Sequence, residues 1–239
     1  MQVKFFLHIF LFIISVALSG VKMELRWLGH AAWLVKFSTT TIVIDPFLTG
    51  NPKAAISASD LKDVNYVLVT HDHSDHLGDA FSIVKNTGAK LVSMFEISQE
   101  AKKSGVPEEN AIGMNIGNQV AFEGVKIGMT PAVHSANSAG FVVSGDDHTL
   151  YHAGDTGFFG DMKHIHDLYD PDVAMLPIGG FFTMGPKEAT LAAETLKAKL
   201  TFPMHYNTFP LIMQDPNEFA KNVHGSKVIV LNPGDTYKL

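Results

Sequence analysis

Residues 70–76, THDHSDH, place three histidines and two aspartates within six positions, directly after the apolar run YVLVT (66–70). A short β-branched and apolar run of this kind predicts a buried strand. Loops at the ends of such strands are where α/β proteins usually carry their chemistry. Histidines at every second position cannot share one helical face, so the segment must be extended or turning, with alternate side chains converging. The feature therefore favours an α/β fold with a ligand cluster at one edge of a sheet.

The cluster offers ligands for two metal ions: His71 and His73 can bind one, while Asp75 and His76 turn toward a second. A solvated polar loop is the plainer interpretation of a lone His-x-His pair. The density of ligands after a buried strand disfavours that interpretation here. Two ions nevertheless need more ligands than one loop supplies, since four-coordinate zinc takes histidine nitrogens and carboxylate oxygens from several segments.

Three further candidates follow other strand-like runs. His134 follows VKIGMTPAV, Asp155 lies in AGDTG behind HTLYH, and His205 follows the short run TFPM. Asp155 is the natural bridging ligand, because its two oxygens can each contact one ion. Singly, each residue is better explained by a structural role such as a turn or a cap, but together with the cluster they complete two sites.

Short apolar runs bounded by Gly, Pro, Asp or Asn predict most of the secondary structure. The predicted strands cover 24–29, 32–37, 41–45, 66–70, 90–94, 118–124, 125–133, 139–144, 148–155, 173–180 and 227–235. The predicted helices cover 77–86, 97–104 and 186–200, the last with Pro at its first turn. Strands come first and then mix with helices, which predicts two packed sheets with helices outside, a four-layer α/β domain.

Composition excludes several classes of function. Hydrophobic residues make up 46% of the chain and charged residues 18%, so a large core can form and disorder is not expected. The net charge is −6 and the basic residues are scattered, so nucleic acid is not an expected partner. The chain has no cysteine, which excludes disulfides, thiolate metal sites and a cysteine nucleophile.

Residues 1–22 differ from the rest of the chain. Lys4 precedes an almost unbroken apolar run over 5–18, and small residues follow. This order is typical of a secretory signal peptide, and the run is shorter than the about 20 apolar residues of a membrane span. We therefore expect export to the periplasm or medium, with no stable membrane span after leader removal. The alternative is a mis-assigned start, with translation from Met23 and a cytoplasmic protein. Either way, 23–239 is predicted to form a single domain.

The ligand-bearing segments resemble a known family. HDHSDH, the histidine of AVHS, the aspartate of AGDT and the histidine of MHYNTF are similar to the signature of the metallo-β-lactamase superfamily. The stretches WLGHAAW, IDPFLTGNP, LPIGGFFTMGP and PMHYNTFP resemble its UPF0173-type metal-dependent hydrolase branch, which has lactonase-like relatives. The resemblance runs from Met23 to the C-terminus. It implies a four-layer αββα sandwich of two mixed β-sheets flanked by helices, with the metals at one edge.

The resemblance also implies the ligand sets. One metal is assigned to His71, His73 and His134, the other to Asp75, His76 and His205, and Asp155 bridges them. Histidine at position 73 favours hydrolysis, because oxygen-reducing diiron relatives carry glutamate there. The expected cofactors are two divalent metal ions, with zinc as the default and Mn, Fe or Ni also compatible with these ligands.

Five other residues lie beside the proposed ligands or near a pocket. His30, in LGHAAW, is either at the site edge or a hydrogen-bonded core residue, and Asp45 either supports a ligand or forms a turn. Thr156 and Asn207 are expected to orient ligands. Phe182 is expected to line a substrate pocket, although an ordinary core role is the alternative.

The expected function is a metal-dependent hydrolase in which a hydroxide bridging two metals attacks an ester, lactone, amide or phosphoester. Asp75 is the expected catalytic residue, orienting the nucleophile and moving a proton. One alternative is a non-catalytic protein that retains metal. A nuclease of the same superfamily is disfavoured, because the chain lacks a basic stretch and spare length. A small-molecule substrate is expected, and the oligomeric state stays open.

Overall fold

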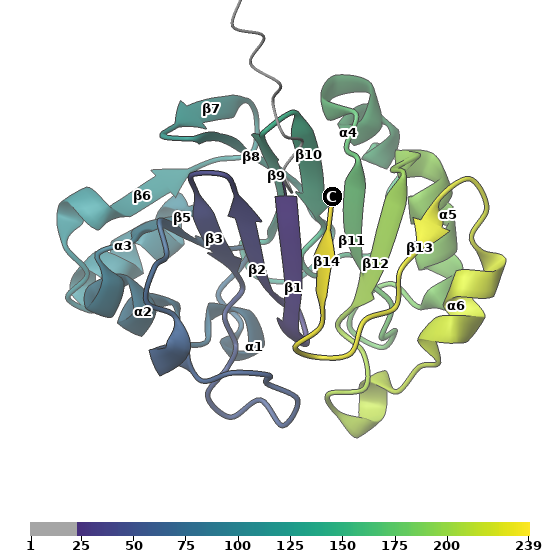
Figure 1. Cartoon of the computed structure of the whole chain (residues 1–239), viewed down its shortest axis with the longest axis horizontal. Coiled ribbons are helices and arrows are strands. Elements are labelled where there is room, and N and C mark those ends of the chain that lie inside the picture. The colour runs from purple at the N-terminus through teal and green to yellow at the C-terminus, as the bar shows by residue number, and fades with distance from the viewer. Residues whose placement is uncertain (1–22) are drawn as a thin grey trace, which may run out of the picture.

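Two seven-stranded β-sheets form the centre of the computed structural model, which describes residues 23–239 (Figure 1). The first sheet has the order β14 (Thr236–Lys238), β1 (Met23–Gly29), β2 (Ala32–Phe37), β3 (Thr41–Ile44), β4 (Tyr66–Val69), β5 (Lys90–Met94), β6 (Ala111–Met114). The second has the order β13 (Lys227–Val228), β12 (Leu200–Met204), β11 (Val173–Pro177), β10 (His148–His152), β9 (Ala139–Gly145), β8 (Val125–Pro131), β7 (Gln119–Phe122). Strands β3 to β6 and β10 to β13 pair in parallel and the others antiparallel, so both sheets are mixed.

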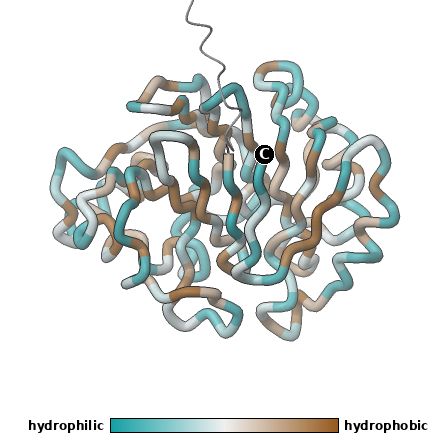
Figure 2. The backbone as a smooth tube through the Cα atoms, in the orientation of Figure 1, coloured by the Kyte–Doolittle hydropathy of each residue, from teal (hydrophilic) through white to brown (hydrophobic). Residues whose placement is uncertain are grey.

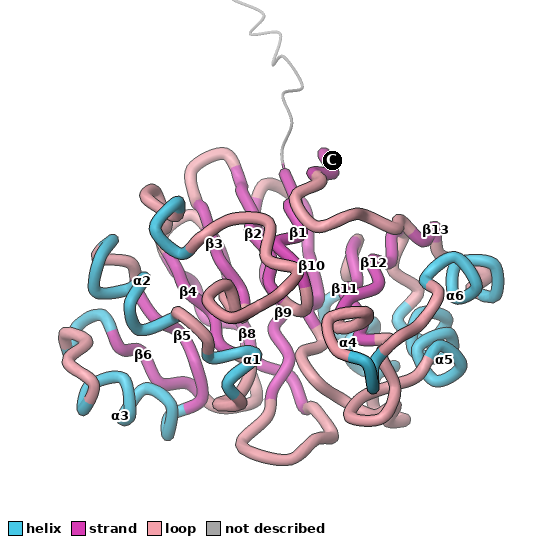
Figure 3. The backbone as a smooth tube through the Cα atoms, turned by 90° about the horizontal axis from the view of Figure 1, so that it is seen from below, coloured by secondary structure: helices cyan, strands magenta, loops and turns pink. Residues whose placement is uncertain are grey.

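Helices cover the outer face of each sheet (Figures 1 and 3). On the first sheet, α2 (Ala80–Thr87) packs on β4 and β5, and α3 (Phe95–Lys103) packs on β5 and β6. On the second, α5 (Pro186–Leu196) packs on β11 and contacts both α4 (Met162–Tyr169) and α6 (Pro216–Asn222). The one-turn helix α1 (Ser74–Leu77) lies at the lower edge in Figure 1. The predicted αββα arrangement is confirmed.

The main core lies between the two sheets. Trp33 of β2 meets Phe202 of β12 edge-on, with ring centroids 5.6 Å apart, and both side chains are buried. The apolar colour in Figure 2 runs along the strands of both sheets. The position of strand β4 explains why its sequence is apolar at every residue. Tyr66 and Leu68 belong to this central core, whereas Val67 and Val69 pack in a second core beneath α2 and α3. A strand covered on both faces needs no polar positions.

Several predicted boundaries were wrong. The helix predicted over 186–200 ends at Leu196, because Lys197 adopts the left-handed conformation (φ 51°) and β12 starts at Leu200. The helix predicted over 77–86 begins only at Ala80 and ends at Thr87, because α1 ends at Leu77 and Gly78 (φ 42°) separates the two helices. The strand predicted over 227–235 pairs only at Lys227–Val228. Helices α4 and α6 and strands β6 and β14 were not predicted, since they are short or lack a clear apolar period.

The predicted leader, residues 1–22, lies outside the described residues. Among residues 23–239, no helix is both long enough and apolar enough to cross a membrane.

The carboxyl ends of the strands that precede the predicted ligands lie at one edge of the sandwich. Parallel pairing aligns the ends of β3, β4 and β5 in one sheet and of β10, β11 and β12 in the other. Strand β8 runs in the same direction as β10, since each is antiparallel to β9 between them. The loops at this edge, at the bottom of Figure 1 and toward the viewer in Figure 3, carry the candidate site.

Candidate metal centre

The seven predicted ligands converge at this edge from four segments of the chain. Asp155, which follows β10, is the point where they meet. Its carboxylate lies 3.2 Å from the Nε2 atoms of both His76 and His205, 3.7 Å from Nε2 of His134 and 4.0 Å from Nε2 of His71. Only 3% of Asp155 is exposed, so a buried carboxylate lies among four imidazole rings.

The first group of ligand atoms contains three ring nitrogens. The Nδ1 atom of His73 lies 3.0 Å from Nε2 of His71 and 3.3 Å from Nε2 of His134. These three atoms lie within 4.8 Å of one another, which suits three ligands of a single ion. His71 and His73 lie two positions apart in the loop between β4 and α1, whereas His134 lies in the loop after β8 of the other sheet.

The second group lies on the other side of Asp155. His205 Nε2 lies 3.8 Å from an oxygen of Asp75, and the ligand atoms of Asp75, His76, His205 and His30 all lie within 4.8 Å of one another. The side chain of Asp75 is 27% exposed, whereas those of His76 and His205 are buried. Asp75 is therefore the member of this group that faces the open side of the centre.

Unsatisfied polar atoms test whether a metal fits here. Among the described residues, the buried side-chain atoms without a hydrogen-bond partner include Nε2 of His76, Oδ1 of Asp155 and both ring nitrogens of His205. The short approaches of these atoms to one another lack hydrogen-bond geometry. A buried polar atom without a partner costs about 1–3 kcal/mol. Nε2 of His76, Nε2 of His205 and the carboxylate of Asp155 lie close together, so these atoms indicate a common partner. Divalent metal ions fit this set of nitrogen and oxygen donors.

Outer hydrogen bonds fix which histidine nitrogens carry protons. The carboxylate of Asp45 is fully buried and accepts from the Thr70 amide (2.8 Å), the Thr70 hydroxyl (2.7 Å) and His76 Nδ1 (2.8 Å). Since the Thr70 hydroxyl donates to Asp45, it must accept from His71 Nδ1, 3.0 Å away. His71 and His76 thus carry a proton on Nδ1, so Nε2 is the nitrogen that faces the centre and can bind a metal once it is free of a proton.

Burial and neighbouring charges shift the pKa values of the candidate ligands in different directions. Burial, together with the neighbouring charge of His76, lowers the pKa of His71 to about 3. Burial also acts to lower the pKa of His76, but the carboxylates of Asp155 and Asp45 outweigh it and raise that pKa well above its ordinary value. Burial acts to raise the pKa of Asp155, yet His76 and His205 hold it well below its ordinary range. A metal that binds here therefore displaces a proton from His76.

His30 lies inside the centre and is fully buried. Its Nε2 lies 3.1 Å from Asp75 Oδ2, and its Nδ1 lies 2.8 Å from the Thr208 hydroxyl. Burial lowers the pKa of His30 to about 4, so the ring is neutral near pH 7. Burial acts to raise the pKa of Asp75, but the nearby His205 ring and the hydrogen bond from His30 lower it more, so Asp75 is a carboxylate.

The other predicted residues fall at different distances from the ligands. Thr156 joins two ligand loops, since its hydroxyl accepts from the Val133 amide (2.9 Å) beside His134. Asn207 instead supports its own loop, where Oδ1 accepts from the Gln214 amide (2.8 Å). Phe182 is 51% exposed on the loop between β11 and α5.

Thr70 is the supporting residue that the sequence interpretation missed. It contacts both Asp45 and His71, and the signal available was a hydroxyl residue at the end of a buried strand, directly before the first histidine.

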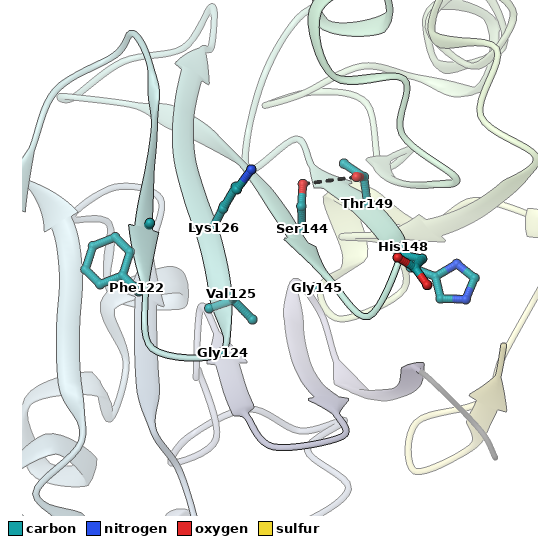
Figure 4. A pocket seen from close by; sticks show the side chains of 10 residues that line it. Phe122, Gly124, Val125, Lys126, Ser144, Gly145, His148 and Thr149 are labelled. Atoms are coloured by element: carbon teal, nitrogen blue, oxygen red, sulfur yellow. Dashed lines mark hydrogen bonds between the residues drawn. The ribbon is translucent and has the colours of Figure 1, made fainter. Parts of the chain in front are cut away.

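A cavity of about 290 Å³ adjoins the centre at His30. The stacked rings of Trp27 and Tyr206 form one wall, with centroids 5.4 Å apart, and Lys53 and Asn207 also line it. A more open recess of about 580 Å³ lies at the opposite ends of β8 and β10, where Lys126, Ser144 and Thr149 line it (Figure 4). It contains none of the ligand residues, so the chemistry belongs to the edge with the histidines.

Comparison with known proteins agrees with this geometry. Residues 40–206 match the model of the beta-lactamase superfamily domain. A UPF0173 metal-dependent hydrolase of Pyrobaculum islandicum is 48% identical over 226 residues, covering 91% of this chain and 100% of the relative. Another, from Thermofilum pendens, is 49% identical over 225 residues, covering 89% and 97%. The structure of Igni18, a metallo hydrolase from Ignicoccus hospitalis, superposes with a TM-score of 0.85 at 40% identity, covering 91% and 98%. The chain therefore belongs to the beta-lactamase superfamily, among its UPF0173 metal-dependent hydrolases.

Proposed function

We propose that this metal-dependent hydrolase works with two divalent metal ions, by default zinc, held at the edge between its sheets. His71, His73 and His134 would hold one ion, Asp75, His76 and His205 the other, and Asp155 both. The observation that carries the proposal is the convergence of buried, unpaired nitrogen and oxygen atoms on Asp155. When bound, such ions lower the pKa of a shared water molecule and polarise a substrate carbonyl.

Asp75 is the side chain best placed to move a proton. It is a carboxylate, it is the most exposed member of its group, and His30 holds one of its oxygens. It would accept a proton from the attacking water and return one to the leaving group. The buried ligands would orient the reacting centre without changing their own protonation.

The loops around the centre favour an uncharged substrate with an apolar group. Large exposed hydrophobic side chains lie on the loops after β8, β10, β11 and β12: Val133, Phe158, Phe181, Phe182, Phe209, Leu211 and Met213. The segments 132–138, 156–160, 178–185 and 206–214 contain no lysine or arginine. Phosphate and carboxylate groups are usually held by such cations. These four loops therefore favour esters and lactones with apolar substituents over phosphoesters, whereas Lys53, which lines the cavity at His30, is a cation outside these loops.

A matched substrate panel tests this function. The metal-loaded protein and its Asp75→Asn variant would be assayed on 4-nitrophenyl hexanoate, on the 4-nitrophenyl monoester of glutarate, on an alkyl lactone and on a phosphodiester. We expect turnover of the uncharged substrates, with kcat reduced about 100-fold or more by Asp75→Asn. Equal inactivity of both proteins on every substrate would favour a metal-retaining binding protein. Preferential cleavage of the phosphodiester would favour the nuclease alternative.

A further inference from the structure

His30 occupies an unusual place in the backbone. It lies in the tight connection between β1 and β2, with φ at 57° and a fully buried side chain. A residue other than glycine is uncommon in this left-handed region, and such residues cluster at functional sites. The conformation turns its carbonyl and its ring toward two different ligand loops.

The backbone of His30 contacts one ligand and its side chain contacts another. Its carbonyl accepts a hydrogen bond from the amide of His205 (3.0 Å), which follows β12 of the second sheet. Its ring nitrogen Nε2 lies 3.1 Å from Asp75, which follows β4 of the first sheet. His30 thus connects the two ligands that enter the second group from opposite sheets.

The hydrogen bonds of the ring determine its role. The carboxylate of Asp75 can only accept, so the proton of His30 lies on Nε2 and is donated to Asp75. The Nδ1 lone pair then accepts from the hydroxyl of Thr208, 2.8 Å away. In this tautomer the ring offers no lone pair to a metal, although Nε2 lies within ligand range of Asp75, His76 and His205. His30 is therefore suited to orient a ligand rather than to be one.

The ring is also fixed by packing. Its centroid lies 4.0 Å from that of His205 and 5.7 Å from that of His76. Phe47 and Phe209 contact it edge-on at 5.8 and 5.5 Å. These rings keep the His30 ring away from water, whereas Asp75, at the other end of the hydrogen bond, is partly exposed. All of these ligand contacts involve the Asp75, His76 and His205 group.

We propose that His30 is a positioning residue that fixes the positions of Asp75 and His205 relative to each other. It thereby sets the affinity of the second metal subsite (Asp75, His76, His205). The first subsite (His71, His73, His134) binds its ion independently of His30. This inference rests on the proposed two-metal centre and adds that His30 affects the metal affinity of only one of its two subsites.

Two amide variants of His30 separate the contact from the backbone geometry. His30→Asn tolerates the left-handed conformation but is too short to reach Asp75. His30→Gln can place an amide N–H near the position of Nε2 and restore the donor. At Thr208, Thr208→Val removes the hydroxyl that donates to Nδ1, and Thr208→Ser keeps it.

Metal titration of the purified, metal-free protein measures the result. Co²⁺ and Zn²⁺ would be titrated against a competing chelator, with the visible absorption of Co²⁺ reporting each step. We expect His30→Asn to weaken one of the two binding steps about 10–100-fold and to leave the other within about twofold. His30→Gln should recover most of this loss, and Thr208→Val should weaken the same step relative to Thr208→Ser.

Other outcomes would overturn the inference. Unchanged binding in His30→Asn, or an equal loss in both steps, removes the proposed role. Loss of a nitrogen ligand from the Co²⁺ spectrum in His30→Gln would make His30 a ligand instead. A wild-type protein that binds a single ion would overturn the inference together with the two-metal centre. Two bound ions without turnover of any ester would remove the proposed function alone. If His30→Asn does not fold, the Thr208 pair decides.

Discussion

Asp45→Asn tests whether outer hydrogen bonds select the metal-binding form of His76. In the native protein, Asp45 Oδ2 accepts from both the Thr70 hydroxyl and His76 Nδ1, and Oδ1 accepts from the Thr70 amide. Asparagine retains one acceptor and replaces the other oxygen with an NH₂ donor. When the NH₂ group takes the place of Oδ2, His76 Nδ1 must accept, so its proton moves to Nε2, which faces Asp155. A protonated Nε2 cannot bind a metal.

The size of the effect follows from the burial of the group. Asp45 and His76 are both fully buried, so water cannot replace the lost contacts. Loss of an outer partner of a ligand histidine typically weakens metal affinity about 10–100-fold, which is about 1.4–2.7 kcal/mol. Removing one partner of a buried charged pair typically costs about 3–5 kcal/mol of stability. The metal-free variant should therefore unfold at markedly lower denaturant concentration than the wild type.

The assay combines metal titration with denaturant unfolding in the presence and absence of a chelator. Asp79→Asn is the matched control, because Asp79 also accepts hydrogen bonds at the same edge, from the backbone amides of Leu48 and Thr49, but contacts no candidate ligand in these bonds. That control should lose some stability but keep its metal affinity. An Asp45→Asn protein that binds both ions as tightly as the wild type would refute the tautomer argument.

Two further predictions concern backbone packing and pH. Gly179→Ala should weaken metal binding, since an added Cβ would lie 2.3 Å from the His205 carbonyl oxygen. Gly160→Ala is the control and should not weaken it, because no heavy atom lies within 4 Å of that Cβ. Equal metal affinities in the two variants would contradict this prediction. Partial burial acts to raise the pKa of Asp172, but hydrogen bonds from Lys199 (2.7 Å) and a backbone amide lower it below its ordinary 3.8. Its contribution is present above pH 3.8 and is lost as pH falls through the folded pKa. Asp172→Asn should therefore lower the free energy of unfolding by up to about 1 kcal/mol near neutral pH, and urea unfolding should show this difference disappearing in acid.

The apolar pattern was enough to predict the layers of the fold. Runs such as YVLV are apolar at every position because both faces of β4 are covered, and this property is visible without coordinates. The apolar pattern was a poorer guide to the ends of helices and strands, which depend on local backbone conformation. Nothing in the helical period of α5 shows that Lys197 turns left-handed and stops the helix at Leu196.

Individual ligands were visible in the sequence because metal binding demands particular side chains after strands. Their convergence was not visible, since it depends on which strand ends share an edge. Asp45 and His30 show the difference most clearly. Each had two equally good interpretations from sequence, and three-dimensional contacts with His76 and Asp75 place both beside the ligands.

The sequence by itself determined the layer architecture, the class of chemistry and the candidate ligands, because apolar periodicity and ligand chemistry are properties of the side chains alone. The tertiary structure decided which atoms of those side chains meet. Contacts such as those of Asp155 with His76 and His205 join residues far apart in the chain. Their geometry, and the protons that each histidine carries, depend on the register of two sheets that only folding brings together.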